Sequence, residues 1–252
     1  MKLALITDIH ANREAFEACF DAACRAGAQG FALLGDFVGY GADPGWVVSQ
    51  IQSLVAEGAV AVRGNHDEAA VIGPDPSMTG DALRTAEWTH GKLTASQREF
   101  LGKLPYTVER NGLLFAHANL HAPATWGYVS TCDEAAQTLM ATRARHAFIG
   151  HMHDPKVYRL VQDEQTGRAM VANKTPKAEK AAHLRPDRQW LVVPGSAGQP
   201  RDGNPAACWA LFDTQSLALT LHRQAYDHQK TAAKIVCAGL PRLLAERLLR
   251  GT

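Results

Sequence analysis

The chain contains the stretch Phe31-Ala32-Leu33-Leu34-Gly35-Asp36-Phe37-Val38-Gly39-Tyr40-Gly41, in which a short apolar run leads directly into a glycine and a carboxylate. Four consecutive apolar residues bounded by glycines are typical of a buried strand of a parallel sheet. Asp36 stands just beyond the point where this strand ends. The sequence therefore predicts a carboxylate at the carboxyl end of a buried strand.

Polar residues follow four other short apolar segments in the same way. They are Asp8-Ile9-His10, Gly64-Asn65-His66-Asp67, His117 and Gly150-His151-Met152-His153. Because the carboxyl ends of parallel strands share one edge of a sheet, we expect five strand ends to bring oxygen and nitrogen ligands to one place.

The first quarter of the chain alternates strand-like and helix-like segments. Asn12 is placed to cap a helix that ends at Gly27, and Pro44 stands where a first helical residue is favoured. The expected order is a strand at 2–7, a helix at 12–27, a strand at 31–34, a helix at 44–58, a strand at 59–62 and a loop at 64–67. This β-α-β-α-β order predicts parallel strands with ligands beyond their carboxyl ends.

The remainder of the chain predicts further strands and helices and contains no segment that reads as a linker. The Asn111-Gly112 pair favours a type I′ turn in a hairpin over 107–115. The segment 162–189 is charged and poor in large apolar residues, so we interpret it as a hairpin or lid inserted in a single domain over 1–252. The other expected elements are a loop at 71–80, helices at 81–90, 94–104, 133–144, 228–238 and 241–250, strands at 147–149 and 157–161, and a second sheet from strands at 190–193, 207–212 and 217–222.

Composition excludes several classes of protein. Of the 252 residues, 46% are hydrophobic and 20% are charged, as in an ordinary soluble globular protein. No apolar run approaches the roughly 20 residues of a membrane span. Asp8 and His10 interrupt the N-terminal apolar segment too early for a secretory signal, so we expect a cytoplasmic protein with no membrane contact. The five cysteines lack C-x-x-C spacing, which argues against a disulfide framework and a zinc ribbon.

The net charge of +1 gives no long-range field that would attract nucleic acid, so no specific nucleic-acid partner is indicated. An anionic substrate must then be held by a local positive centre. Histidine, aspartate and asparagine ligands suit Mn²⁺, Fe²⁺, Zn²⁺, Co²⁺ or Ni²⁺. A carboxylate shared by two such ions holds them roughly 3.5 to 4 Å apart, and a hydroxide between them attacks phosphoric esters at neutral pH. The expected cofactors are therefore two divalent ions, with manganese preferred, and the expected partner is a small phosphorylated substrate.

The five motifs resemble, in order and spacing, those of the calcineurin-like metallophosphoesterase superfamily. This resemblance implies that Asp36 bridges the two metals. It also implies that His66 is not a ligand but gives a proton or hydrogen bond to the leaving oxygen. By the same resemblance, one metal is held by Asp8, His10 and His153, and the other by Asn65, His117 and His151.

The chain also resembles the small bacterial and archaeal phosphodiesterase-like branch of YfcE and MJ-type proteins. The segments 8–12, 39–44, 194–201 and 239–241 carry this likeness. It implies an α/β fold in which a two-sheet sandwich is flanked by helices. Protein Ser/Thr phosphatases of the superfamily carry Asp and Arg where this chain has Gly39 and Tyr40, so a protein phosphatase is not expected. His117 is preferred to His121 as the ligand because it leaves the hairpin strand directly.

Three further residues are candidates for substrate binding. Arg201 could meet the substrate phosphate, although an arginine that supports its own loop is an equal alternative. Asn12 is first a helix cap and second a phosphate contact. Tyr40 is placed to line the pocket.

The predicted function is metal-dependent hydrolysis of phosphoric esters by direct attack of a bridging hydroxide, without a phospho-enzyme intermediate. Phosphodiesters are the first choice of substrate. Phosphomonoesters and dinucleoside polyphosphates are alternatives, because one metal core serves all three. A non-catalytic scaffold on the same fold, similar to the retromer subunit, is the alternative of another class. The complete ligand set and His66 weigh against it, and the sequence predicts no oligomeric state.

Overall fold

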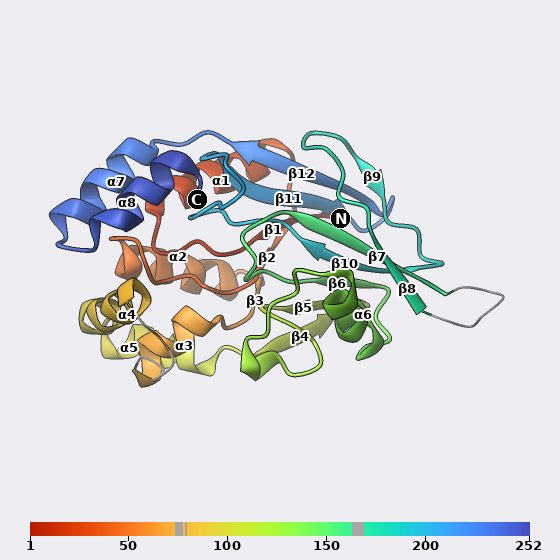
Figure 1. Ribbon diagram of the computed structural model, residues 1–252, viewed down its shortest axis with the longest axis horizontal. Coiled ribbons are helices and arrows are strands. Elements are labelled where there is room, and N and C mark those ends of the chain that lie inside the picture. Colours follow the sequence, from red (N-terminus) through yellow and green to blue (C-terminus); the bar gives the residue numbers. More distant parts are fainter. Residues whose placement is uncertain (74–77, 79, 163–168) are drawn as a thin grey trace.

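Two six-stranded mixed sheets form the centre of the molecule, and helices lie outside them (Figure 1). The computed structural model describes residues 1–73, 78, 80–162 and 169–252. In spatial order, sheet A contains β3 (Val60–Ala61), β2 (Gly30–Leu33), β1 (Lys2–Ile6), β11 (Ala207–Asp213), β12 (Ala218–Gln224) and β9 (Ala182–His183). Sheet B contains β4 (Thr107–Arg110), β5 (Leu113–Ala116), β6 (His146–Phe148), β10 (Gln189–Val193), β7 (Lys156–Gln162) and β8 (Ala169–Asn173). The predicted two-sheet α/β sandwich flanked by helices is confirmed.

The helices lie on the outer sides of the two sheets (Figure 1). They are α1 (Arg13–Arg25), α2 (Pro44–Ala56), α3 (Asn65–Ile72), α4 (Gly80–Lys92), α5 (Ala95–Lys103), η1 (Pro123–Thr125), α6 (Cys132–Met140), α7 (His228–Cys237) and α8 (Arg242–Arg250). The N-cap of α1 is Asn12, as predicted, and α2 begins at Pro44. The predicted helix at 133–144 ends earlier, at Met140. Within the described residues, no helix has both the length and the hydrophobicity needed to cross a membrane.

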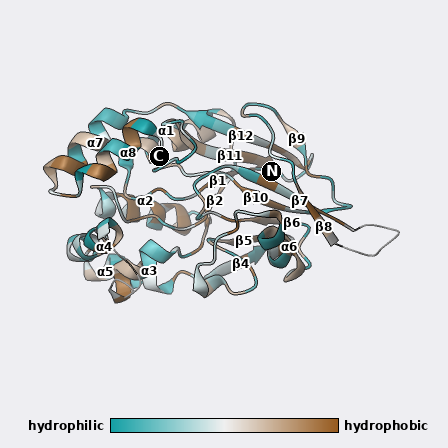
Figure 2. Ribbon diagram, viewed as in Figure 1, coloured by the Kyte–Doolittle hydropathy of each residue, from teal (hydrophilic) through white to brown (hydrophobic). Residues whose placement is uncertain are grey.

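The alternation of side chains along β1 explains how sheet A packs against sheet B on one face and against helices on the other. Leu3 and Leu5 face the core between the two sheets, where they join Phe115 of sheet B. Ala4 and Ile6 face the opposite side, against the apolar faces of α1 and α2. Because successive strand residues point to opposite faces, a strand covered on both sides must be apolar throughout. Figure 2 accordingly shows a largely hydrophobic α2, and a hydrophilic start to α3, which carries site residues instead.

Within each sheet, the strands whose ends carry the polar motifs run parallel to one another. In sheet A, β1, β2 and β3 are mutually parallel, and in sheet B, β6 is parallel to both β5 and β10. The prediction that 190–193, 207–212 and 217–222 form one second sheet is wrong. Strand β10 belongs to sheet B, whereas β11 and β12 continue sheet A beside β1. Alternating hydrophobicity marks a strand but does not encode which sheet it joins.

The predicted loop at 64–67 is also wrong, because Asn65, His66 and Asp67 form the first turn of α3. Asp67 accepts a 2.9 Å hydrogen bond from the backbone N–H of Gly64, the residue that caps the helix. A carboxylate at this position stabilises a helix start. Polar first turns resemble loops in composition, which explains the error.

Two expected segments lie partly outside the described residues. Of the loop at 71–80, residues 74–77 and 79 are not described, and α3 extends to Ile72. Of the segment 162–189, residues 163–168 are not described. The rest provides β8, which pairs with β7, and β9, which pairs with β12. A hairpin or lid in a single domain remains a prediction.

Candidate metal centre

The candidate ligands lie where parallel strands end, at the shared edge of the two sheets. Asp8 and His10 follow β1, Asp36 follows β2, Asn65 and His66 begin α3 after β3, His117 follows β5, and His151 and His153 follow β6. The side chains of these residues, apart from the partly exposed Asn65, are almost completely buried. Segments far apart in the sequence therefore bring their polar atoms to one enclosed place.

Three overlapping groups of donor atoms can be defined in this place. In each group, the donor atoms lie within 4.8 Å of one another. Asp36 belongs to two of the groups, and His10 also belongs to two. The groups are Asp8 with His10 and His153, His10 with Asp36 and His66, and Asp36 with His117 and His151.

Asp36 uses its two carboxylate oxygens differently. Its Oδ1 accepts a 2.8 Å hydrogen bond from the backbone N–H of His66. Its Oδ2 lies 3.3 Å from Nε2 of His117 and 3.8 Å from Nε2 of His10. One oxygen is therefore anchored by α3, while the other faces histidines on both sides.

Backbone carbonyls orient the histidines. The Nδ1 atoms of three rings lie within hydrogen-bond distance of carbonyl oxygens: His10 at 3.2 Å from Val38, His117 at 2.7 Å from Leu34, and His153 at 2.6 Å from Gln199. A carbonyl only accepts, so each Nδ1 carries a proton, and each ring in its neutral form presents the Nε2 lone pair to the centre. His151 is reversed, since its Nε2 donates to the carbonyl of Trp126 at 2.9 Å and leaves Nδ1 free.

Several polar atoms of the centre are buried and have no hydrogen-bond partner among the described residues. They are Oδ1 of Asp8, Oδ1 of Asn65, Nδ1 of His66 and Nε2 of His117. Buried polar atoms nearly always have partners, so such a concentration is typical of a site that holds a bound ion. Two carboxylates, one amide and four imidazoles form a donor set that fits borderline divalent cations. The residues present therefore fit the expected metal ions.

Burial sets most of the protonation states. It lowers the pKa of His151 to about 3 and the pKa values of His10 and His153 well below their ordinary range. Neutral imidazole is the form that binds a metal. Burial alone would also lower the pKa of His117, but the neighbouring Asp36 carboxylate outweighs it and raises that pKa to about 9. Burial raises the pKa of Asp8 to about 6.

The backbone of the centre is strained. Asp8, His10, Asp36, His151 and His153 all have φ between 50° and 70°. Residues with a Cβ rarely adopt this left-handed region, and each such residue costs on the order of 1 kcal/mol. The surrounding hydrogen bonds must offset this cost, which is typical of a functional site.

His66 lies beside the centre against Gly39 and Tyr40. Its ring centroid is 4.4 Å from that of Tyr40 and 5.1 Å from that of His10. A Cβ atom on Gly39 would approach Nδ1 of His66 to 2.7 Å, so only glycine leaves room for the ring there. Burial lowers the pKa of His66 from its usual value.

The three candidate substrate residues have different surroundings. The guanidinium of Arg201 lies 5.9 Å from the ring centroid of Tyr40 and donates a 2.7 Å hydrogen bond to Oε1 of Gln199. The ring centroid of Tyr40 lies 4.7 Å from that of His10, so a partly accessible tyrosine ring borders the centre. The side chain of Asn12 caps α1 and donates to the carbonyl of Gly198 at 2.8 Å, which ties it to the structure.

Two groups that support the centre were not predicted from the sequence: the Asp67 carboxylate and the Trp126 carbonyl. Oδ1 of Asp67 accepts the backbone N–H groups of Phe37 and Val38, at 2.9 and 3.2 Å, and so holds the turn after β2. Its position three residues after a helix-capping glycine was a usable signal. The second contribution is the Trp126 carbonyl that orients His151. No sequence signal could have predicted it, because every residue has a backbone oxygen.

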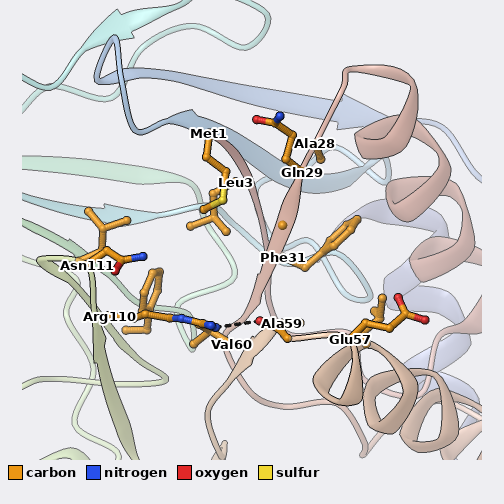
Figure 3. Close-up of a pocket in the computed structure, with 15 residues that line it drawn as sticks. Met1, Leu3, Ala28, Gln29, Phe31, Glu57, Ala59, Val60, Arg110 and Asn111 are labelled. Atoms are coloured by element: carbon orange, nitrogen blue, oxygen red, sulfur yellow. Dashed lines mark hydrogen bonds between the residues drawn. The ribbon is translucent and has the colours of Figure 1, made fainter.

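A separate cavity of about 320 Å³ lies beside the amino ends of β1, β2 and β3, opposite the candidate metal centre (Figure 3). Met1, Leu3 and Phe31 line it, and Arg110 there donates a 2.8 Å hydrogen bond to the Gly58 carbonyl. Among the described residues that line it, none is a candidate ligand. This cavity is therefore not the reaction site.

Comparisons with known proteins agree with this geometry. The uncharacterized protein MJ0912 of Methanocaldococcus jannaschii is 32% identical over 99% of this chain and 98% of its own length. The crystal structure of a metallophosphoesterase from Sphaerobacter thermophilus is similar with a TM-score of 0.86 and 30% identity, covering 100% of this chain and 99% of the other. The hypothetical protein PH1004 from Pyrococcus horikoshii OT3 shares the fold, with a TM-score of 0.78 at 18% identity over 100% and 98% of the two chains.

The family model for the calcineurin-like phosphoesterase superfamily domain matches residues 1–217. This range includes every candidate ligand, and it confirms the resemblance seen in the motifs. The chain belongs to the calcineurin-like phosphoesterase superfamily and is a metal-dependent phosphoester hydrolase.

Proposed function

We propose that this protein is a phosphodiesterase that uses two divalent metal ions, with Asp36 shared between them. The observation that carries the proposal is the position of Oδ2 of Asp36, which lies within 4 Å of Nε2 atoms from two separate ligand groups. Oδ1 of the same carboxylate accepts the His66 N–H, so Oδ2 is the oxygen that would be left to the ions. The unpaired atoms of Asp8, Asn65 and His117 support the same arrangement.

Each proposed ion has three ligands besides Asp36. Asp8, His10 and His153 would hold one ion, and Asn65, His117 and His151 would hold the other. When bound, the two ions would produce a strong nucleophile from water at neutral pH and offset the charge of the phosphate. Manganese is the preferred metal, with iron, zinc, cobalt or nickel as alternatives that the donor set also accepts.

His66 is the proposed proton donor to the leaving oxygen. Its ring lies against the first ligand group, and its Nδ1 is buried without a partner. An imidazolium can give a proton to an oxygen as negative charge develops there, and a neutral imidazole can give that oxygen a hydrogen bond from its N–H. The alternative is that His66 only positions Asn65. This role would leave Nδ1 of His66 without a function.

Tyr40 and Arg201 are proposed to meet the phosphate on the side of His66. The chain has a net charge of only +1, so a local cation is needed to attract an anionic ester. Arg201 lies close enough to the Tyr40 ring for its guanidinium to serve that purpose. The hydrogen bond from Arg201 to Gln199 fixes the guanidinium in place. The main role of Asn12 is to cap α1, and contact with the phosphate is its alternative role.

A screen of metal-reconstituted protein tests the proposal. Bis(p-nitrophenyl) phosphate, p-nitrophenyl phosphate, cyclic nucleotides and dinucleoside polyphosphates should be compared after loading with Mn²⁺, Co²⁺, Fe²⁺, Zn²⁺ or Ni²⁺. The proposal expects the highest kcat/KM on a diester. A higher value on the monoester or on a dinucleoside polyphosphate would select one of those activities instead. Cleavage of none of them would favour a non-catalytic scaffold.

A further inference from the structure

A cavity of about 460 Å³ lies beside the candidate metal centre, between α3 and the segment that follows η1. Two candidate metal ligands, Asn65 and His151, are part of its wall, so the cavity adjoins the centre directly. We call it the aromatic cleft. The residues that define it are Asn65, Glu68, Ile72, Trp126, Tyr128 and His151.

The aromatic cleft and His66 lie on different sides of α3. Asn65, Glu68 and Ile72 are spaced at three and four residues, so they share one face of the helix. His66 is one position further along and thus about 100° around the helix. Its ring packs on Tyr40 at 4.4 Å, and it is not among the residues that line the cleft. An ester at the centre can therefore place one organic group toward His66 and another in the cleft.

The accessible walls of the cleft are flat or apolar. The ring of Tyr128 stacks on that of His151, with centroids 4.2 Å apart and planes 15° apart, and Tyr128 is 57% exposed. Ile72 is 76% exposed. Large apolar side chains held at such exposure beside a reaction site indicate contact with a ligand.

Among the described residues that line the cleft, the one carboxylate is that of Glu68, and it is already engaged. Oε2 of Glu68 accepts a 3.2 Å hydrogen bond from Nε1 of Trp126, and Oε1 accepts from the hydroxyl of Tyr106. The described residues that line the cleft include no lysine and no arginine. As far as the structure describes its lining, the cleft offers no side-chain cation to a second phosphate, and it suits an uncharged group.

We propose that the aromatic cleft binds the organic group that stays on the phosphorus during hydrolysis, and that this group is a neutral planar aromatic such as an aryl ring or a nucleobase. The inference rests on the proposed phosphodiesterase function and specifies its substrate. The retained ring stacks on the ring of Tyr128. The leaving group departs on the side of His66. A substrate whose retained part is a further phosphate chain binds the cleft poorly.

Two diesters with the same leaving group test this assignment. They are phenyl p-nitrophenyl phosphate and methyl p-nitrophenyl phosphate, and the readout is the ratio of their kcat/KM values. Because the leaving group is shared, a change in this ratio between variants reports only the retained group. Stacking of one ring on an aromatic side chain contributes roughly tenfold in binding. We therefore expect Tyr128→Ala to lower the phenyl-to-methyl ratio by at least about fivefold, while Tyr128→Phe, which keeps the ring, preserves it.

A second pair of variants avoids the neighbourhood of His151. Ile72→Asp should lower the ratio by introducing a charge into the cleft, whereas Ile72→Leu should not. Metal content is measured for every variant, and if Tyr128→Ala loses metal, the Ile72 pair decides. An unchanged ratio in metal-loaded Tyr128→Ala and Ile72→Asp overturns the inference but leaves the phosphodiesterase proposal standing. Failure of the unmodified protein to cleave either diester overturns the phosphodiesterase proposal, and the inference with it.

Discussion

The backbone N–H of His66 donates a 2.8 Å hydrogen bond to Oδ1 of Asp36. This bond joins the first turn of α3 to the turn after β2, so the proposed proton donor and the proposed bridging ligand are positioned by one contact. It also leaves Oδ2 of Asp36 free to face His10 and His117. The geometry of the centre therefore depends on a helix start that places Asn65 and His66 in consecutive positions.

Replacing Asp36 with asparagine removes the charge that two ions would share. Even loss of a residue that only orients a metal ligand costs about 10- to 100-fold in affinity or activity, so loss of a shared ligand should cost more than about 100-fold in kcat. Steady-state kinetics and elemental analysis would measure the two losses together. Asp133→Asn, at an exposed position on α6, is the matched control and should retain both activity and metal. Full activity in Asp36→Asn would exclude the bridging role.

His66→Ala should lower kcat by about 10²- to 10⁴-fold without reducing metal content, because general-acid catalysis contributes in that range. The loss should be larger for an ester with a poor leaving group, such as phenol, than for a p-nitrophenyl ester that needs little protonation. Equal losses for both leaving groups would argue against proton donation. Loss of metal in this variant would instead make His66 a ligand.

His117 and His121 provide a direct comparison between the two histidines considered as ligands. His117 is fully buried with an unpaired Nε2, whereas His121 is exposed. His117→Ala should therefore bind less metal per chain and lose activity, and His121→Ala should match the unmodified protein in both. Elemental analysis after dialysis would measure the difference. The opposite pattern would assign the ligand to His121.

Metal binding should release a proton at pH 8. In the metal-free protein, Asp36 raises the pKa of His117 to about 9, so His117 is protonated below that pH. A metal ion binds only the neutral ring, which makes affinity rise with pH up to about 9. The raised pKa of His117 also adds to the free energy of unfolding of the metal-free protein. This stabilisation is complete below pH 6.5 and is lost as the pH rises through about 9. Calorimetric titration in two buffers of different ionisation enthalpy counts the protons, and a count of zero at pH 8 would contradict this account.

Asp67→Ala should destabilise the fold. The carboxylate accepts the backbone N–H groups of Phe37, Val38 and Gly64, all of them buried. Leaving buried donors without an acceptor costs about 1–3 kcal/mol per group, and partial relaxation should bring the total to about 2–4 kcal/mol. Chemical denaturation of the metal-free protein measures this loss, with Asp133→Ala as the exposed control. A change below about 0.5 kcal/mol would show that water replaces the carboxylate.

Much of the fold was predictable because local signals were strong. Asn12, Pro44 and the Asn111-Gly112 pair mark a cap, a helix start and a turn, and each lies where it was expected. Placement of β10 in sheet B was not predictable, since pairing depends on contacts between strands distant in the sequence. The start of α3 was missed because Asn65, His66 and Asp67 are all polar, and a polar first turn resembles a loop in composition.

The site was predictable to the same extent. Ligand candidates after strand ends could be read from the motifs, and the structure brings their donor atoms together. The stacking of Tyr128 on His151 and the carbonyl of Trp126 that orients the same ring could not be read in this way. Both are contacts between segments that only the tertiary fold brings together.

Titration of the metal-free protein with Mn²⁺, while hydrolysis of bis(p-nitrophenyl) phosphate is followed, tests the central claim most directly. Activity should rise until two ions are bound per chain, and Asp36→Asn should show no such rise. Activity that is complete with one ion, or no hydrolysis at any metal content, would contradict a two-metal phosphodiesterase built around Asp36.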